Sequence, residues 1–96
     1  MVPEHIEIVF KTKDFMWGVE NAFGKKFMHI DIKEFNPRTF KKMKRSLYKL
    51  RKDFNEPLYG YGLDDSTYKL MDLFGFKETG LITVIENKRR RIKCLF

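Results

Sequence analysis

The stretch NPRTFKKMKRSLYKLRKDF, residues 36–54, has the pattern of one long amphipathic helix. Asn36 is a favoured N-cap residue, and Pro37 loses no needed hydrogen bond at the first helical position. Apolar side chains then recur at intervals of three and four residues, which places them on one face of the helix. They are Phe40, Met43, Leu47, Leu50 and Phe54. We expect this face to be buried against a sheet.

On the N-terminal side of this helix, the sequence predicts two or three antiparallel strands. Residues 6–10 and 27–32 have strand composition, and residues 14–22 are an ambiguous further strand. Gly24-Lys25 between them is typical of a hairpin turn. In the last of these segments, Met28, Ile30 and Ile32 alternate with Phe27, His29 and Asp31, so we expect the two sets on opposite faces.

On the C-terminal side, residues 56–62 form a short predicted strand in the sheet interior, followed by a short helix that Gly75 ends. Residues 77–86 and 91–96 are rich in β-formers and predict a closing hairpin. The order is therefore β(β)β-α-β-α-β-β. It predicts a single α/β (α+β) domain over residues 1–96, with a mixed, mostly antiparallel sheet and two helices.

Composition supports a small globular domain, because 43% of the 96 residues are hydrophobic and 16% are aromatic. The single cysteine, Cys94, excludes a disulfide within the chain and a cysteine zinc cluster, and no other metal site is expected. Residues 1–5 do not have the pattern of a signal peptide, and no apolar run approaches the ~20 residues that span a bilayer. We expect no membrane partner.

The net charge of +7 is unevenly distributed along the chain. Eight of the 20 Lys and Arg residues lie between Arg38 and Lys52, and five lie between Lys88 and Lys93. Such clusters attract polyanions, although a charged run can also be a solvated surface. We predict contact with an acidic protein surface or nucleic acid, and a second copy of the chain could also supply the acids. The candidate residues are Arg38, Lys41, Lys42, Lys44, Arg45, Lys49, Arg89, Arg90 and Arg91.

The segment LYGYGLDDSTYKLMDLFGFKETG, residues 58–80, carries a family resemblance. With its Gly75-Phe76 and Gly80, it resembles the GNAT superfamily of N-acetyltransferases, whose order of elements fits the chain from Phe27 onward. The chain looks most like the short, diverged acetyltransferase-like proteins that some tailed phages carry, including as internal virion components. The resemblance implies a truncated GNAT-like fold and a location in the host-cell cytoplasm or the virion interior.

Members of the family bind acetyl-CoA. A glycine-containing loop before the long helix binds the pyrophosphate of this cofactor. Here residues 35–41 contain no glycine, and Pro37 lacks an N–H donor. The site would survive only as a vestige, formed by Asn36, Arg38, Thr39 and Lys41. The family's helix-start Asn falls on Asp64, and its general-acid Tyr falls on Met71, which has no proton to give. We therefore expect no catalytic residue and no bound cofactor.

Three hypotheses follow from these patterns. The first is a catalytically degenerate GNAT-like domain that acts by binding, as a phage-type virion or host-interaction protein. The second is an active acetyl-CoA-dependent N-acetyltransferase, and the third is a nucleic-acid-binding module that uses the basic helix. Tyr59 and Tyr61 either form a base-stacking platform beside that helix or pack against a helix, and the second arrangement is favoured. His5 and His29 are expected to be structural or surface residues.

Overall fold

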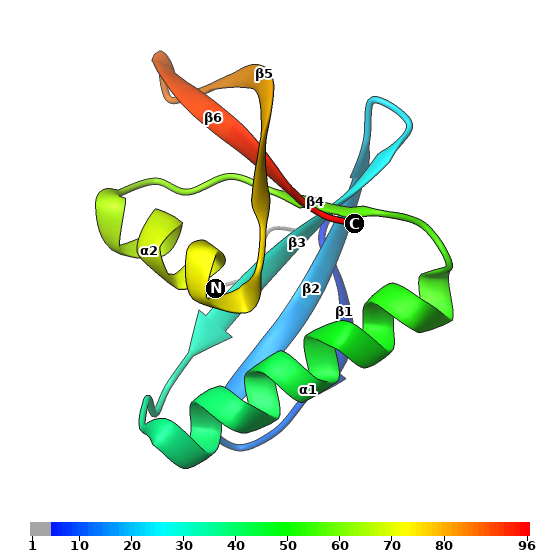
Figure 1. Cartoon of the computed structure of the whole chain (residues 1–96), viewed down its shortest axis with the longest axis vertical. Coiled ribbons are helices and arrows are strands. Elements are labelled where there is room, and N and C mark those ends of the chain that lie inside the picture. The colour runs from blue at the N-terminus through cyan, green and yellow to red at the C-terminus, as the bar shows by residue number, and fades with distance from the viewer. Residues whose placement is uncertain (1–4) are drawn as a thin grey trace.

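The computed structural model describes residues 5–96; residues 1–4, on which the expectation about a signal peptide largely rests, lie outside the described part. Strands and helices follow one another in the predicted order (Figure 1). They are β1 (Glu7–Lys11), β2 (Phe15–Ala22), β3 (Lys25–Ile32), α1 (Pro37–Phe54), β4 (Leu58–Gly60), α2 (Asp65–Phe74), β5 (Lys77–Ile85) and β6 (Lys88–Leu95). None of the helices among residues 5–96 is long and apolar enough to cross a membrane.

All six strands belong to one sheet, in the order β1-β2-β3-β4-β6-β5. Only β3 and β4 are parallel, and the long helix α1 is the crossover between them. The other neighbours are antiparallel, which confirms the prediction of a mixed, mostly antiparallel sheet with two helices. In Figure 1 the β5–β6 hairpin projects beyond the rest of the sheet, on the side where α2 lies.

Helix α1 begins and ends where the sequence predicts, for identifiable reasons. The side chain of Asn36 accepts a hydrogen bond from the Thr39 N–H at 2.9 Å, and Pro37 occupies the first turn. The helix ends at Asn55, whose φ of 53° is left-handed, and whose N–H bonds the last carbonyls. Two apolar side chains on the inner face, Met43 and Leu47, are completely buried.

Both helices pack on the same face of the sheet, and Trp17 on β2 contacts each of them. Its indole N–H donates to the Ser46 hydroxyl of α1 at 2.9 Å, and its ring meets Phe74 of α2 edge-on at 5.6 Å. Phe40 of α1 stacks on Phe74 of α2 at 5.3 Å, so the two helices also contact each other. The predicted apolar stripe of α1 is thus confirmed, with Phe40, Leu50 and Phe54 partly buried against the core.

The structure differs from the predicted boundaries at β4 and at the last turn. Strand β4 spans only Leu58–Gly60, because the chain then runs close against α2. A Cβ on Gly60 would lie 3.0 Å from Met71, and one on Gly62 would lie 2.9 Å from Thr67. The last hairpin turns at Glu86 and Asn87, which have φ of 54° and 63°, so β6 begins three residues earlier than predicted.

Candidate functional site

The outward surface of α1 is strongly basic and has few acidic neighbours. We call its cations the basic face: Arg38, Lys41, Lys42, Lys44, Arg45, Lys49 and Lys52. Among residues 5–96 these seven make a single ion pair, between Lys49 and Asp53 at 3.3 Å. The first turn of α1 contains no acidic residue. The positive charge of the helix is therefore not neutralised by the fold that the structure describes.

Two shallow hollows lie beside α1 and have Tyr48 in both linings; we refer to the two hollows together as the α1 groove. The first has a volume of about 510 Å³ and is lined by Pro37, Phe40, Lys41, Lys44, Arg45 and Tyr48. The second has a volume of about 450 Å³ and is lined by Tyr48, Arg51, Lys52, Asn55, Leu95 and Phe96. Neither lining contains an acidic side chain. The groove therefore combines cations with exposed aromatic rings.

The second basic segment, on β6, behaves differently because most of its cations have partners within the fold. The Arg90 guanidinium donates to the carbonyl of Leu63 at 2.7 Å. Arg91 pairs with Glu78 at 2.8 Å, and its guanidinium lies 4.5 Å from the ring centre of Tyr68.

Lys93, on the same strand, is buried and pairs with Asp72 of α2. Of the three β6 residues predicted to bind a partner, Arg90 and Arg91 have hydrogen-bond partners within the fold. Arg89 is the one that stays exposed with no ion pair to residues 5–96.

The four residues of the vestigial phosphate site do not form an open anion site. Asn36 and Thr39 bond to each other: the Asn36 Oδ1 accepts from the Thr39 N–H and also from its hydroxyl, at 2.9 and 3.0 Å. Thr39 is buried, while Arg38 and Lys41 point to solvent. The helix therefore caps itself with its own side chains, and the remaining two residues belong to the basic face.

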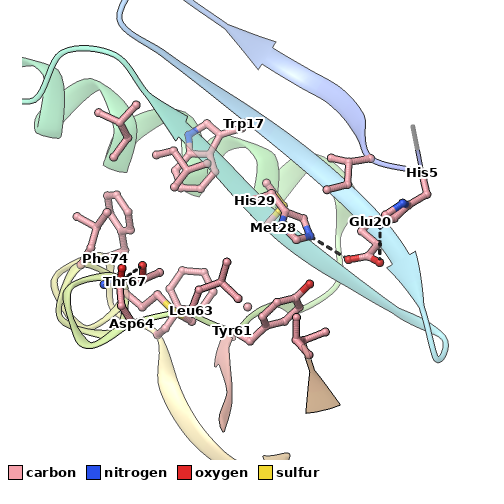
Figure 2. A pocket seen from close by; sticks show the side chains of 18 residues that line it. His5, Trp17, Glu20, Met28, His29, Tyr61, Leu63, Asp64, Thr67 and Phe74 are labelled. Carbon is pink, nitrogen blue, oxygen red and sulfur yellow. Dashed lines mark hydrogen bonds and ion pairs between the residues drawn. The ribbon is translucent and has the colours of Figure 1, made fainter. Parts of the chain in front are cut away.

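A separate cleft opens in the sheet where β3 and β4 diverge. Only two pairs of residues, Lys26–Leu58 and Phe27–Tyr59, join these strands. Beyond them β3 continues to Ile32, while the chain after Gly60 leads into α2. The resulting cavity has a volume of about 720 Å³. Figure 2 shows Trp17, Met28 and His29 on one side of it and Tyr61, Leu63, Asp64, Thr67 and Phe74 on the other.

One end of the cleft carries a group of titratable side chains around Glu20 (Figure 2). Its two carboxylate oxygens lie 3.1 Å from Nε2 of His5 and 2.9 Å from Nε2 of His29. The Tyr61 ring meets His29 edge-on, and burial together with the charge of Glu20 raises the pKa of Tyr61. These polar side chains lie beside a cavity with a mostly apolar lining. However, the lining contains no Lys or Arg that could hold a phosphate.

The structure corrects the expectation for Tyr59 and Tyr61. Tyr59 and Tyr61 pack against Phe27, each at 5.9 Å, on the sheet face opposite α1. Both arrangements considered for them, a platform beside the basic helix and packing against a helix, are therefore wrong.

His5 and His29 are distant in sequence, but both contact the carboxylate of Glu20. The one sequence signal for this cluster was the hairpin at Gly24, which places Glu20 and His29 on the same face of adjacent strands. No group of side chains among residues 5–96 has the geometry of a metal site.

Comparison with known proteins adds no relative: no family model, no curated protein and no solved structure matches this chain. The candidate sites therefore depend on their own geometry and charge.

Proposed function

We propose that this chain is a small GNAT-like domain that acts by binding a polyanionic partner through the basic face of α1. One observation carries the proposal. Of the seven cations on that face, Lys49 alone pairs with an acid among residues 5–96. Binding as a phage-type virion or host-interaction protein, in the host-cell cytoplasm or the virion interior, is the setting that the resemblance implies.

The arrangement of charge on α1 costs folding energy, which supports a role in binding. Lys41–Arg45 and Arg45–Lys49 are like charges at i and i+4, and such pairs destabilise a helix by a few tenths of a kcal/mol each. A helix selected only for stability would contain glutamate at some of these positions. An external partner with negative charge supplies the attraction that the fold lacks.

Binding is favoured over acetyl transfer for two structural reasons. The N-terminus of α1 begins with Pro37, which has no N–H, and the N–H groups of Thr39 and Phe40 are bonded to Asn36. The first turn therefore leaves only the Arg38 N–H, whereas a pyrophosphate is held by several backbone donors. The cleft between β3 and β4 is lined by no Lys or Arg. The observed order of strands and helices supports the GNAT-like part of the proposal, and acetyl-CoA chemistry would need a phosphate site elsewhere.

Titration by fluorescence anisotropy tests the proposal. The probes are a labelled single-stranded DNA, the matching duplex and a poly-glutamate peptide, each at several salt concentrations. At least one should bind with an affinity that falls steeply with salt. The triple variant Lys41→Glu, Lys42→Glu, Arg45→Glu should lose this binding. If the probe is nucleic acid, the log–log salt slope of any affinity that remains should be smaller by about 2–3, for the three lost contacts.

A matched control separates the basic face from the overall charge. The variant Lys69→Glu, Lys77→Glu, Lys88→Glu changes the net charge equally, at exposed positions on α2 and the β5–β6 hairpin. It should keep most of the affinity. Equal losses in the two variants would contradict a specific role for α1. Calorimetry with acetyl-CoA completes the test, because a specific complex of micromolar or better affinity would favour the acetyltransferase hypothesis instead.

A further inference from the structure

The α1 groove contains an aromatic ring that is held in place and yet open to solvent. Tyr48 is 44% exposed, although its hydroxyl donates to the carbonyl of Phe74 at 2.8 Å. Gly75 follows directly, and a Cβ there would lie only 3.0 Å from the Tyr48 hydroxyl oxygen. The ring is therefore fixed by α2 and lines both hollows, so ordering it on binding costs little conformational entropy.

Cations flank this ring on both sides along the groove. Lys44 lies 5.8 Å from the ring centre, and Lys41 and Arg45 line the same hollow. Arg51 and Lys52 line the other hollow. From Lys41 to Lys52 the helix rises roughly 16 Å, which several nucleotides of an extended strand could follow.

Arg51, which lines the second hollow, is held between the groove and the core. Its Nε is buried and makes no hydrogen bond to any described residue, as is also true of the Nε of Arg90 on β6. The positive charge of Arg51 is nevertheless not paired with an acid among residues 5–96 and adds to that of Lys52 in this hollow.

From these observations we propose that the α1 groove binds single-stranded nucleic acid, with one base stacked on Tyr48 and the adjacent phosphates on the flanking cations. This inference rests on the proposed function and names the partner of the same surface. Single strands expose the faces of their bases, which stack on aromatic rings without regard to sequence. A duplex keeps those faces covered, and an acidic peptide has no flat group that needs the ring. A duplex or an acidic peptide would therefore bind through the cations alone.

The test compares three probes of equal length, a labelled oligothymidine, a DNA duplex and a poly-glutamate peptide, on the full chain and its variants. We expect the single strand to bind most tightly. Tyr48→Ala should weaken that binding by roughly 5- to 150-fold, which corresponds to one stacked base. Its salt slope should stay unchanged, because the slope counts phosphates rather than stacked bases. Tyr48→Phe keeps the ring and should bind nearly as the unmodified chain does.

A second measurement uses only the unmodified chain, so its result does not depend on whether Tyr48→Ala folds. Oligonucleotides that contain 5-iodouracil are photocrosslinked to the unmodified chain, and mass spectrometry should map the adduct to Tyr48. The inference is overturned if the duplex or the peptide binds as tightly as the single strand, or if the adduct maps to the opposite sheet face. The proposed function survives that result when the Lys41, Lys42, Arg45 triple variant still abolishes binding. If that variant binds every probe normally, both proposals are wrong.

Discussion

The two basic segments of this chain have similar composition and opposite structural roles. Residues 38–52 contain eight cations, and residues 88–93 contain five. On β6 three cations are engaged by groups of the same fold, with Arg91 and Lys93 bonded to acids. On α1 only Lys49 has an acidic partner among residues 5–96. The density of charge in a sequence therefore does not distinguish a binding surface from an internal ion-pair network.

The difference follows from the environment of each element. Strand β6 lies between β4 and β5, and its side chains reach the acids Glu78 on β5 and Asp72 on α2. Helix α1 contacts the sheet with one face only, so its remaining faces meet solvent. A central strand has neighbours on both sides, whereas a helix on the outside of a sheet has a free surface that a partner can use.

The largest expected effect is on stability and concerns the inner face of α1. The comparison between α1 and β6 requires that this face holds the helix against the sheet. Leu47 is completely buried, so Leu47→Ala removes packed methyl groups and leaves a cavity. The free energy of unfolding should fall by about 2–5 kcal/mol, measured by urea denaturation. The exposed substitution Lys42→Ala is the control and should change it little. An unchanged midpoint for Leu47→Ala would mean that α1 is not anchored as described.

The ion pair of β6 should have the next largest effect. Asp72→Asn removes one of the two carboxylates near the buried ammonium of Lys93 and leaves Glu78 at 3.7 Å, so the free energy of unfolding should fall by about 1–3 kcal/mol. Lys93→Met keeps the packed volume without the charge and should be near neutral. In the double variant the Asp72→Asn penalty should disappear. If Asp72→Asn leaves the free energy of unfolding unchanged, the cations of β6 contribute no more to the stability of the fold than those of α1.

A smaller effect of opposite sign is expected on α1. Arg45→Glu turns two repulsive i, i+4 contacts, with Lys41 and Lys49, into attractive ones. The protein should become slightly more stable, by about 0.8–2 kcal/mol in total, while its affinity for a polyanion falls. Thermal melting and the anisotropy titration measure the two quantities on the same sample. A loss of stability would show that Arg45 serves the fold, as Arg91 does on β6.

The smallest expected effect concerns pH and the caps of the two helices. The Thr67 N–H and hydroxyl bond the Asp64 carboxylate and lower its pKa below the ordinary 3.8. Stability from this cap is therefore present above pH 3.8 and is lost as the pH falls through the lowered pKa. Amide exchange of α2 should accelerate in that range before that of α1, whose Asn36 cap does not titrate. Asp64→Asn should abolish the difference, and an unchanged difference would contradict this origin.

Much of the fold could be predicted from local patterns. The Asn36-Pro37 start, the apolar spacing of α1 and the Gly75 end of α2 all depend on residues close in sequence, and the structure confirms them. The candidate sites could be predicted only in part. The basic face of α1 was visible in the helical pattern, but the arrangement of His5, Glu20 and His29 depends on strand register.

What the sequence by itself determined is the set of elements, their order and the cations on each, because caps, turns and periodicity act over a few residues. The tertiary structure alone decided which cations remain free. Arg90, Arg91 and Lys93 gain their partners from residues 13 to 27 positions away, brought close by the insertion of β6 between β4 and β5. It also joined Tyr48 to the last residues of α2 through a hydrogen bond across 26 positions. Such contacts depend on the packing of distant segments, which no local pattern contains.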